Sequence, residues 1–231
     1  MTAELRGGGD LVVCDGASRT FGSGESAVVA LQGATCRVRR SARIALTGPS
    51  GSGKSTLLHL MAGLDRPTAG TISWPGLPAS VDHPGTVGVV FQGPSLMPPL
   101  NALENIAYPL LLSGMADGEA RRAAAQAMEQ IGIAELAGSL PDEMSGGQAQ
   151  RVAVARALAA SPALVLADEP TGQLDHEAGA VVMDALVRAT DLLDAGLVVA
   201  THDPNVAARL DESWQIGDGR LRLLPLEAGA R

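Results

Sequence analysis

Aromatic and lysine residues are scarce in this chain of 231 residues. Phe, Trp and Tyr make up 2% of the sequence, whereas apolar residues together make up 46%. The core must therefore be filled by Val, Leu, Ile and Ala, and it is large enough for one α/β domain without a long disordered portion. Every basic residue except Lys54 is arginine.

Cysteine is also scarce, since Cys14 and Cys36 are the only two and they form no C-x-x-C pattern. The first residues show no apolar run of the kind found in secretory signals. We therefore expect reduced thiols in a cytoplasmic protein rather than a disulfide. The longest apolar stretch, residues 152–167, is interrupted by Arg156 and Pro162 and is too short to cross a bilayer. If the protein works at a membrane, another subunit must cross it.

The sequence lacks the excess of positive charge that is typical of proteins that bind nucleic acids. Its formal net charge is −8, and its pI is about 4.9. Domains that bind nucleic acid normally present a basic face, so we expect no nucleic-acid partner. A nucleotide remains possible, because it needs only a local pocket of hydrogen-bond donors.

Short apolar strands alternate with helices along most of the chain. The segments 43–47, 163–168 and 197–201 are almost uninterrupted in apolar residues, which is typical of a parallel sheet buried on both faces. The glycine-punctuated N-terminal region predicts short strands at 11–13, 28–31 and 35–38. Further strands are predicted at residues 71–74 and 87–91, and helices at 55–64, at 176–190 and from Pro204 onward. Two closing segments follow at 212–217 and 220–224.

Residues 101–160 depart from this alternation. Three helices are predicted there with almost no strand signal, at residues 102–112, 118–133 and 146–160. We predict one α/β domain over residues 1–231, with a mixed, mostly parallel sheet and an N-terminal antiparallel β region. Its core is expected at about 1–92 and 161–231, and an inserted helical subdomain at about 93–160.

A glycine-rich phosphate loop follows the strand at 43–47. It reads GPSGSGKST and satisfies the pattern G-x-x-x-x-G-K-[ST] between a strand and a helix. The glycines let backbone N–H groups surround an anion, and the helix N-terminus adds partial positive charge. Lys54 can reach the β- and γ-phosphates, and the Ser55 hydroxyl can hold Mg²⁺. The predicted ATP-binding residues of the loop are Gly48, Pro49, Ser50, Gly51, Ser52, Gly53, Lys54, Ser55 and Thr56.

Two carboxylates end the strand at 163–168. Asp168 and Glu169 stand at its carboxyl end, where open α/β sheets bind their ligands. Asp168 is expected to orient Mg²⁺ through water, and Glu169 to polarise an attacking water as general base. An ordinary acidic strand end before the turn at Pro170 is the alternative, and the phosphate loop makes it the weaker interpretation.

The segment SGGQ, residues 145–148, is a second glycine-rich helix start, in which Ser145 is a good N-cap. With it, the sequence from about 11 to 224 resembles the nucleotide-binding domains of ATP-binding cassette (ABC) proteins. Six motifs follow in that family's order: GPSGSGKST (Walker A), Gln92 in VVFQGPSLMP (Q-loop), SGGQ (signature), LVLADE (Walker B), residues 172–175 (D-loop) and His202 in ATHD (H-loop).

The resemblance implies an ATP site shared between two molecules. In ABC proteins the signature faces the γ-phosphate of ATP bound to a second, head-to-tail cassette. A homodimer is therefore expected, and a single chain should bind ATP but turn it over poorly. The residues that would act on the partner's nucleotide are Ser145, Gly146, Gly147 and Gln148. Two departures from the family pattern, a short segment at 75–84 and Met144 in place of the usual Leu, remove no catalytic group.

The same resemblance assigns the remaining roles. Gln92 would contact Mg²⁺ and the attacking water, His202 would hydrogen-bond the γ-phosphate, and Asp175 would lie at the dimer seam. Phe21 stands where the family commonly stacks a tyrosine on adenine; a phenyl ring still stacks, although packing in a small core is the alternative. The expected catalytic residues are Lys54, Gln92, Glu169 and His202, and the expected metal ligands are Ser55, Gln92 and Asp168.

The segments GLDRPTAG, ALENIAYPL and DEPTGQLD most resemble the subgroup of lipoprotein release, of macrolide or peptide export, and of a related cell-division regulator. We predict an ATP-hydrolysing subunit that powers a separate membrane permease from the inner face of the cell membrane. The alternative is a regulatory ABC ATPase that moves an extracellular partner without transport. A soluble ABC ATPase of DNA repair or translation fits less well, because such chains usually carry two cassettes or a long coiled-coil insert. Residues 94–112 either dock the permease or pack within the helices, and both interpretations stay open.

Overall fold

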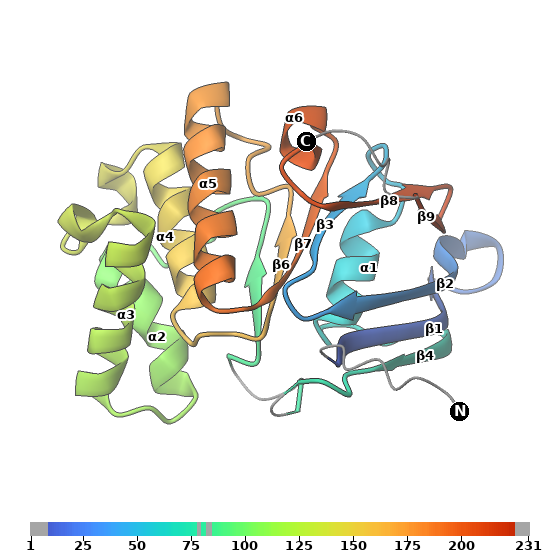
Figure 1. Cartoon of the computed structure of the whole chain (residues 1–231), viewed down its shortest axis with the longest axis horizontal. Coiled ribbons are helices and arrows are strands. Elements are labelled where there is room, and N and C mark those ends of the chain that lie inside the picture. Colours follow the sequence, from blue (N-terminus) through green and yellow to red (C-terminus); the bar gives the residue numbers. More distant parts are fainter. Residues whose placement is uncertain (1–8, 78–79, 82–84, 225–231) are drawn as a thin grey trace, which may run out of the picture.

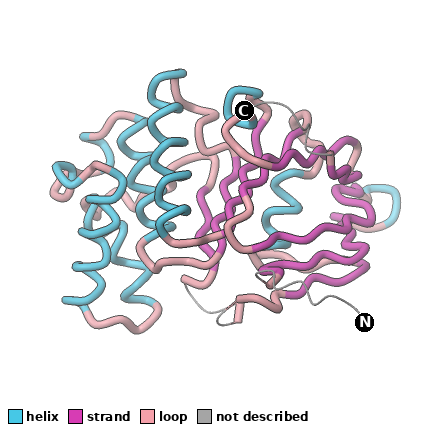
Figure 2. The backbone as a smooth tube through the Cα atoms, in the orientation of Figure 1, coloured by secondary structure: helices cyan, strands magenta, loops and turns pink. Residues whose placement is uncertain are grey.

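The computed structural model describes residues 9–77, 80–81 and 85–224. In this part of the chain the strands form two sheets, and most of the helices gather on one side of them (Figures 1 and 2). The helices are α1 (Lys54–Met61), α2 (Ala102–Leu112), α3 (Asp117–Ile131), α4 (Gly146–Leu158), α5 (His176–Leu192) and α6 (Pro204–Ala207).

The larger sheet has six strands in the order β5-β6-β7-β3-β8-β9. Five of them run parallel, and β9 alone pairs antiparallel, at one edge. The predicted α/β class with a mixed, mostly parallel sheet is confirmed. The strand bounds are β3 (Arg43–Thr47), β5 (Val87–Val90), β6 (Leu164–Asp168), β7 (Gly196–Thr201), β8 (Glu212–Gly217) and β9 (Arg220–Leu223).

Both faces of this sheet are covered by apolar side chains. Alternate residues of a strand point to opposite faces, so Val165 and Ala167 of β6 pack with α2–α5, whereas Leu164 and Leu166 pack with α1 and the smaller sheet. All four are fully buried. Burial of one large aliphatic side chain contributes about 1.5–3 kcal/mol. The carboxyl ends of the parallel strands are therefore held on a rigid support.

The smaller, antiparallel sheet consists of β1 (Asp10–Phe21), β2 (Val28–Arg39) and β4 (Ala69–Ser73) in the order β2-β1-β4. The prediction of two separate strands at 28–31 and 35–38 was wrong. Both belong to β2, because Gly33 adopts a φ of 58° inside the strand and the register against β1 shifts there. A glycine with positive φ accommodates such a bulge without ending the strand.

Helices α2, α3 and α4 form a block at one end of the molecule (Figure 1). Asn101 caps α2 through a capping box with Glu104, which explains why the helix begins there. The apolar cluster inside this block continues onto α5 and one face of the large sheet. The division into a core and a helical subdomain at residues 93–160 stays a prediction. Within the described residues, no helix combines the length and apolar character needed to span a membrane.

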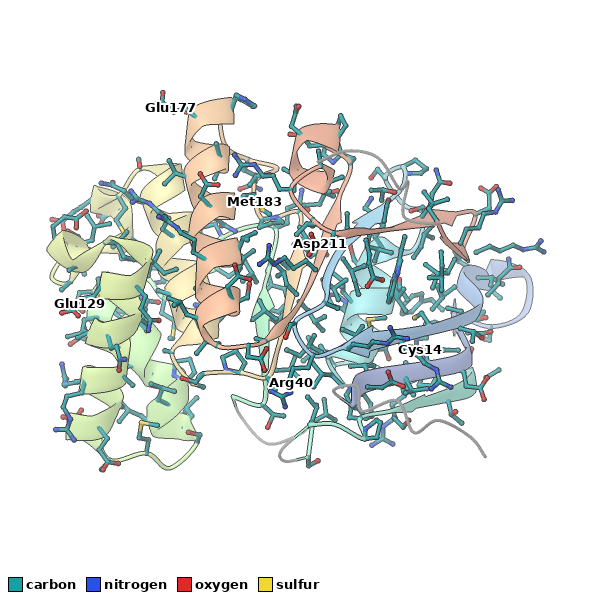
Figure 3. The ribbon with its side chains drawn as sticks, viewed as in Figure 1. Cys14, Arg40, Glu129, Glu177, Met183 and Asp211 are labelled. Carbon is teal, nitrogen blue, oxygen red and sulfur yellow. The ribbon has the colours of Figure 1, made fainter. Side chains whose placement is uncertain are left out.

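The two cysteines lie opposite each other in the β1–β2 pair and are buried, free thiols. Figure 3 labels Cys14 at the smaller sheet, on the right of the view. A hydrogen bond with Cys14, burial and the neighbouring thiol raise the pKa of Cys36 far above its usual value. Because the thiolate is the reactive form, this thiol should be inert in the folded protein.

We therefore predict that maleimide leaves Cys14 and Cys36 unmodified in the folded protein and labels both after denaturation. Mass spectrometry of native and guanidinium-treated samples checks this. Labelling of the native protein at the rate of a free, exposed thiol would contradict the buried arrangement.

Candidate active site

The phosphate loop connects β3 to α1 and depends on two glycines. A Cβ atom on Gly48 would lie 2.2 Å from the carbonyl oxygen of Ile216, and one on Gly53 would lie 2.3 Å from that of Ala30. Gly53 also has a φ of 108°, which favours glycine. Because neither glycine has a side chain, the loop can pass this close to the backbone at Ala30 and Ile216. Pro49, Ser50, Gly51 and Ser55 are exposed along it, and Thr56 is half-buried.

Lys54 is the first residue of α1 and is buried, with 6% of its surface exposed. Its Nζ donates hydrogen bonds to the carbonyl oxygens of Gly48, at 2.9 Å, and Pro49, at 3.1 Å. The same nitrogen lies 3.5 Å from Glu169 Oε1. The fold thus brings the predicted phosphate-binding cation and the predicted general base together, although they are far apart in sequence.

Two buried oxygens, Ser52 Oγ and Asp168 Oδ1, have no hydrogen-bond partner within the part of the chain that the structure describes. Leaving a buried polar group unpaired costs about 1–3 kcal/mol. Such atoms call for a partner from outside the chain. Carboxylate oxygens suit Mg²⁺ or its bound waters, so the Asp168 oxygen fits a magnesium nucleotide. The metal role of Ser55, which is exposed, stays a prediction.

Glu169 directly follows β6 and has a left-handed backbone, with a φ of 46°. This conformation costs a residue other than glycine about 1–2 kcal/mol, and the bond from its N–H to the Ala200 carbonyl, 2.9 Å, helps to hold it. The carboxylate lies between Lys54 and His202, whose Nδ1 is 2.9 Å from Oε2. Backbone strain at such a place indicates a functional site.

The Gln92 and Asp175 loops meet the turn that carries Glu169. Gln92 follows β5 and is exposed, and its Nε2 would lie 3.8 Å from a Cβ atom on Gly172. The Gly172 N–H bonds the Glu169 carbonyl at 3.0 Å. Asp175 caps α5 by accepting a bond from the Ala178 N–H at 2.8 Å.

The signature residues lie in the other layer of the molecule. Ser145 is the N-cap of α4, as predicted, and it exchanges hydrogen bonds with Gln148 in a capping box. Gly147 is so close to the start of α5 that an added Cβ would lie 3.1 Å from Ala178 Cβ, and Gly146 faces Leu174. Helix α4 packs on one face of the large sheet and α1 on the other (Figure 1).

Phe21 ends β1 and is 43% exposed, so it does not fill a small core as the alternative interpretation proposed. The Arg19 guanidinium carbon lies 4.6 Å from the centre of its ring. Arg19 is in turn held by Asp65, with 2.8 Å between Nε and Oδ2. Adenine stacking on Phe21 stays a prediction.

Sequence reasoning missed Gln150 and Arg156, two side chains of α4 that contact the Gln92 loop. A signal was available, since Arg156 is a charged residue in an almost wholly apolar helical stretch. Charged residues are rarely buried unless they have a specific partner.

Comparison with known proteins decides the family. Residues 31–172 match the family model described as ABC transporter. The chain belongs to the ABC transporter family. The predicted resemblance is confirmed, and this ABC cassette is an ATP-binding subunit that hydrolyses ATP.

Named relatives extend over most of the ABC cassette. The lipoprotein-releasing system ATP-binding protein LolD of Legionella pneumophila (strain Paris) is 40% identical over 211 residues, which cover 88% of this chain and 93% of that protein. The uncharacterized ABC transporter ATP-binding protein YbbA of Escherichia coli (strain K12) is 41% identical over 212 residues, with the same shares. The dimeric, post-hydrolysis structure of the cassette MJ0796 bound to ADP and Pi superposes with a TM-score of 0.83 at 33% identity, covering 94% of this chain and all of that one.

The contacts at Gly53 generate a direct test of the phosphate loop. We predict that Gly53→Ala lowers the free energy of unfolding by about 2 kcal/mol, because it combines left-handed strain with a steric clash, and that it abolishes ATP binding. Thermal unfolding and nucleotide titration measure the two effects. Gly217→Ala in β8 is the control, because a Cβ there meets nothing within 4 Å; wild-type ATP affinity in Gly53→Ala would contradict the loop geometry.

Proposed function

We propose that this ABC cassette powers a separate membrane permease, and that two copies close on ATP to do so. The observation that carries the proposal is the distribution of the motifs over two layers. Lys54, Glu169 and His202 meet at the carboxyl edge of the sheet, whereas the glycines of the signature begin α4, which packs on the face of that sheet opposite α1. Two head-to-tail molecules would each complete the other's site.

The proposed chemistry follows from the contacts around Glu169. Its carboxylate would accept the proton of the water that attacks the γ-phosphorus, and His202 would hold the carboxylate and the phosphate in place. Lys54 and the N-terminus of α1 would stabilise charge on the phosphates and on the departing ADP. Mg²⁺, when bound, would be held by Ser55, Gln92 and Asp168 and would neutralise phosphate charge.

Support for a dimer comes from the solved relatives. The MJ0796 cassette has been determined as a dimer, in one case with ADP and Pi. At 33% identity over nearly all of both chains, the same assembly is proposed here. Ser145 and Gly146 are exposed at the start of α4, as contact with a second molecule requires, and Asp175 would lie at the seam.

Support for a permease comes from α2. One side of this helix packs inward through Ile106 and Leu110, while Tyr108, Leu111 and Leu112 are exposed by 39%, 37% and 69%. The interpretation that residues 94–112 pack within the helices therefore holds for the inward side of α2, and docking of the permease would use its exposed side. A groove of about 170 Å³ between α2, α4 and β5 adjoins this apolar surface. A permease docked there would hold the cassette at the inner face of the cell membrane.

The relatives point to the work that the permease does. Several are named as ATP-binding proteins of the lipoprotein-releasing system, so we propose the extrusion of a lipoprotein, peptide or drug. Co-purification with the membrane subunit, followed by reconstitution into vesicles, tests this. ATP-dependent flux supports transport, whereas closure of the dimer without flux would support the regulatory alternative.

The role of Glu169 leads to a kinetic prediction. Glu169→Gln should keep ATP binding but lower kcat by about 10²–10⁴-fold, the usual contribution of a general base, and it should trap an ATP-bound dimer. Steady-state ATPase assays and size-exclusion chromatography measure both effects. Glu129→Gln is the matched control, because this exposed residue projects from α3 at the far end of the molecule (Figure 3). Normal turnover in Glu169→Gln would remove Glu169 from the base role.

The shared site leads to a second prediction. Ser145→Arg and Lys54→Met should each be inactive alone, yet a mixture of the two proteins should regain part of the ATPase activity. In a mixed dimer, one site combines an intact Lys54 with an intact Ser145. Doubling the concentration of either variant alone is the control. A mixture that forms dimers but has no activity would count against the head-to-tail arrangement.

A further inference from the structure

The loop that carries Gln92 is fastened to helix α4 at both ends. On one side, Nε2 of Gln150 donates a hydrogen bond of 3.2 Å to the carbonyl of Phe91. On the other, the guanidinium of Arg156 donates to the carbonyls of Pro94, at 2.9 Å, and Ser95, at 3.0 Å. Gln92 lies between these attachment points. We call Gln150 and Arg156 the α4 clamp.

Gln150 lies in the interior, whereas Arg156 is half-buried. Gln150 is 2% exposed. Burial lowers the pKa of Arg156, and no ion pair found in the described ranges includes this residue. A partly buried charge needs compensating hydrogen bonds, and the carbonyls of Pro94 and Ser95 supply them. The planar guanidinium can reach both carbonyls at once, whereas the ammonium group of lysine is a point charge without this fork.

The loop conformation itself requires such support. Ser95 has a left-handed backbone, with a φ of 45°, which a residue other than glycine adopts only when its surroundings impose it. Its carbonyl is one of the two that Arg156 binds. Helix α4, in turn, is buried along the side that includes Val152 and Ala155, so the clamp is anchored on a rigid element.

We propose that Gln150 and Arg156 are positioning residues that keep Gln92 beside the Glu169 turn. Because the signature residue Ser145 is the N-cap of α4, the clamp also makes the Gln92 loop and the signature helix one mechanical unit. A shift of α4 when the signature engages a partner's nucleotide would then move Gln92 at its own site. The inference rests on the proposed function, in which Gln92 contacts the metal and the attacking water.

Amide hydrogen exchange without nucleotide or metal tests the clamp itself. We expect Arg156→Met to speed exchange over residues 91–97 by about tenfold, which corresponds to about 1.4 kcal/mol, the size of one lost hydrogen bond. Arg151→Met is the matched control, because Arg151 lies on the same helix but bonds the Gly132 carbonyl instead. Unchanged exchange in Arg156→Met, or equal acceleration in both variants, overturns the clamp.

A double-mutant cycle tests the link to catalysis. Arg156→Met should lower kcat by about 10–100-fold, with the ATP KM changed less than about threefold, because the phosphate loop does not contact Arg156. In a Gln92→Ala background the same change should have almost no further effect. The kcat of Arg156→Lys should lie between those of the wild type and Arg156→Met. If Arg156→Met does not fold, Arg156→Lys and Gln150→Met replace it in the same measurements.

The outcomes separate the inference from the function on which it rests. If Arg156→Met lowers kcat by the same factor in the wild type and in Gln92→Ala, the positioning role is overturned, while Gln92 remains a catalytic residue. Wild-type kcat in Gln92→Ala overturns the proposed role of Gln92, and with it the catalytic consequence of the clamp. In that case the exchange experiment still decides whether the α4 clamp holds the loop.

Discussion

The geometry of the candidate active site depends on the contact between Lys54 and Glu169. Their charged atoms lie 3.5 Å apart, although the residues belong to segments that are distant in sequence. The contact exists because β3 and β6 flank β7 in a parallel sheet, so both strands end at the same edge. Apolar side chains cover both faces of that sheet. A rigid core thus holds the Lys54 cation, the carboxylate of Glu169 on its left-handed backbone, and an Asp168 oxygen that has no partner among the described residues, where a nucleotide can complete them.

The same sheet separates the two halves of the proposed chemistry. Helix α1 carries the phosphate loop on one face, and α4 carries the signature on the other. A single molecule would have both parts without being able to close them on one nucleotide. The loops of Gln92 and Asp175 run between the layers, and each contacts the turn after Glu169 or the start of α5. A shift of α4 or α5 on binding of a partner would in this way be transmitted to Glu169 through these two short loops.

Much of this could be predicted from the sequence, because its local patterns carry physical requirements. The loop around Lys54 matched a motif whose glycines are required by close backbone contacts, and Ser145 has the side chain of a helix cap. Strands β3, β6 and β7 of the large sheet were recognised because burial on both faces leaves them almost continuously apolar. Sequence reasoning failed where tertiary contacts decide. Two strands were predicted at 28–31 and 35–38, but Gly33 forms a bulge inside the single strand β2. The bonds of Arg156 to the Gln92 loop depend on long-range packing.

If ATP is hydrolysed between two copies of the chain, the specific ATPase rate must depend on the protein concentration. Analytical ultracentrifugation of the same samples gives the fraction of dimer at each dilution. We expect the ATPase rate per chain to decrease in proportion to the fraction of dimer and to approach zero when monomers dominate. A rate per chain that stays constant on dilution to monomers would contradict it.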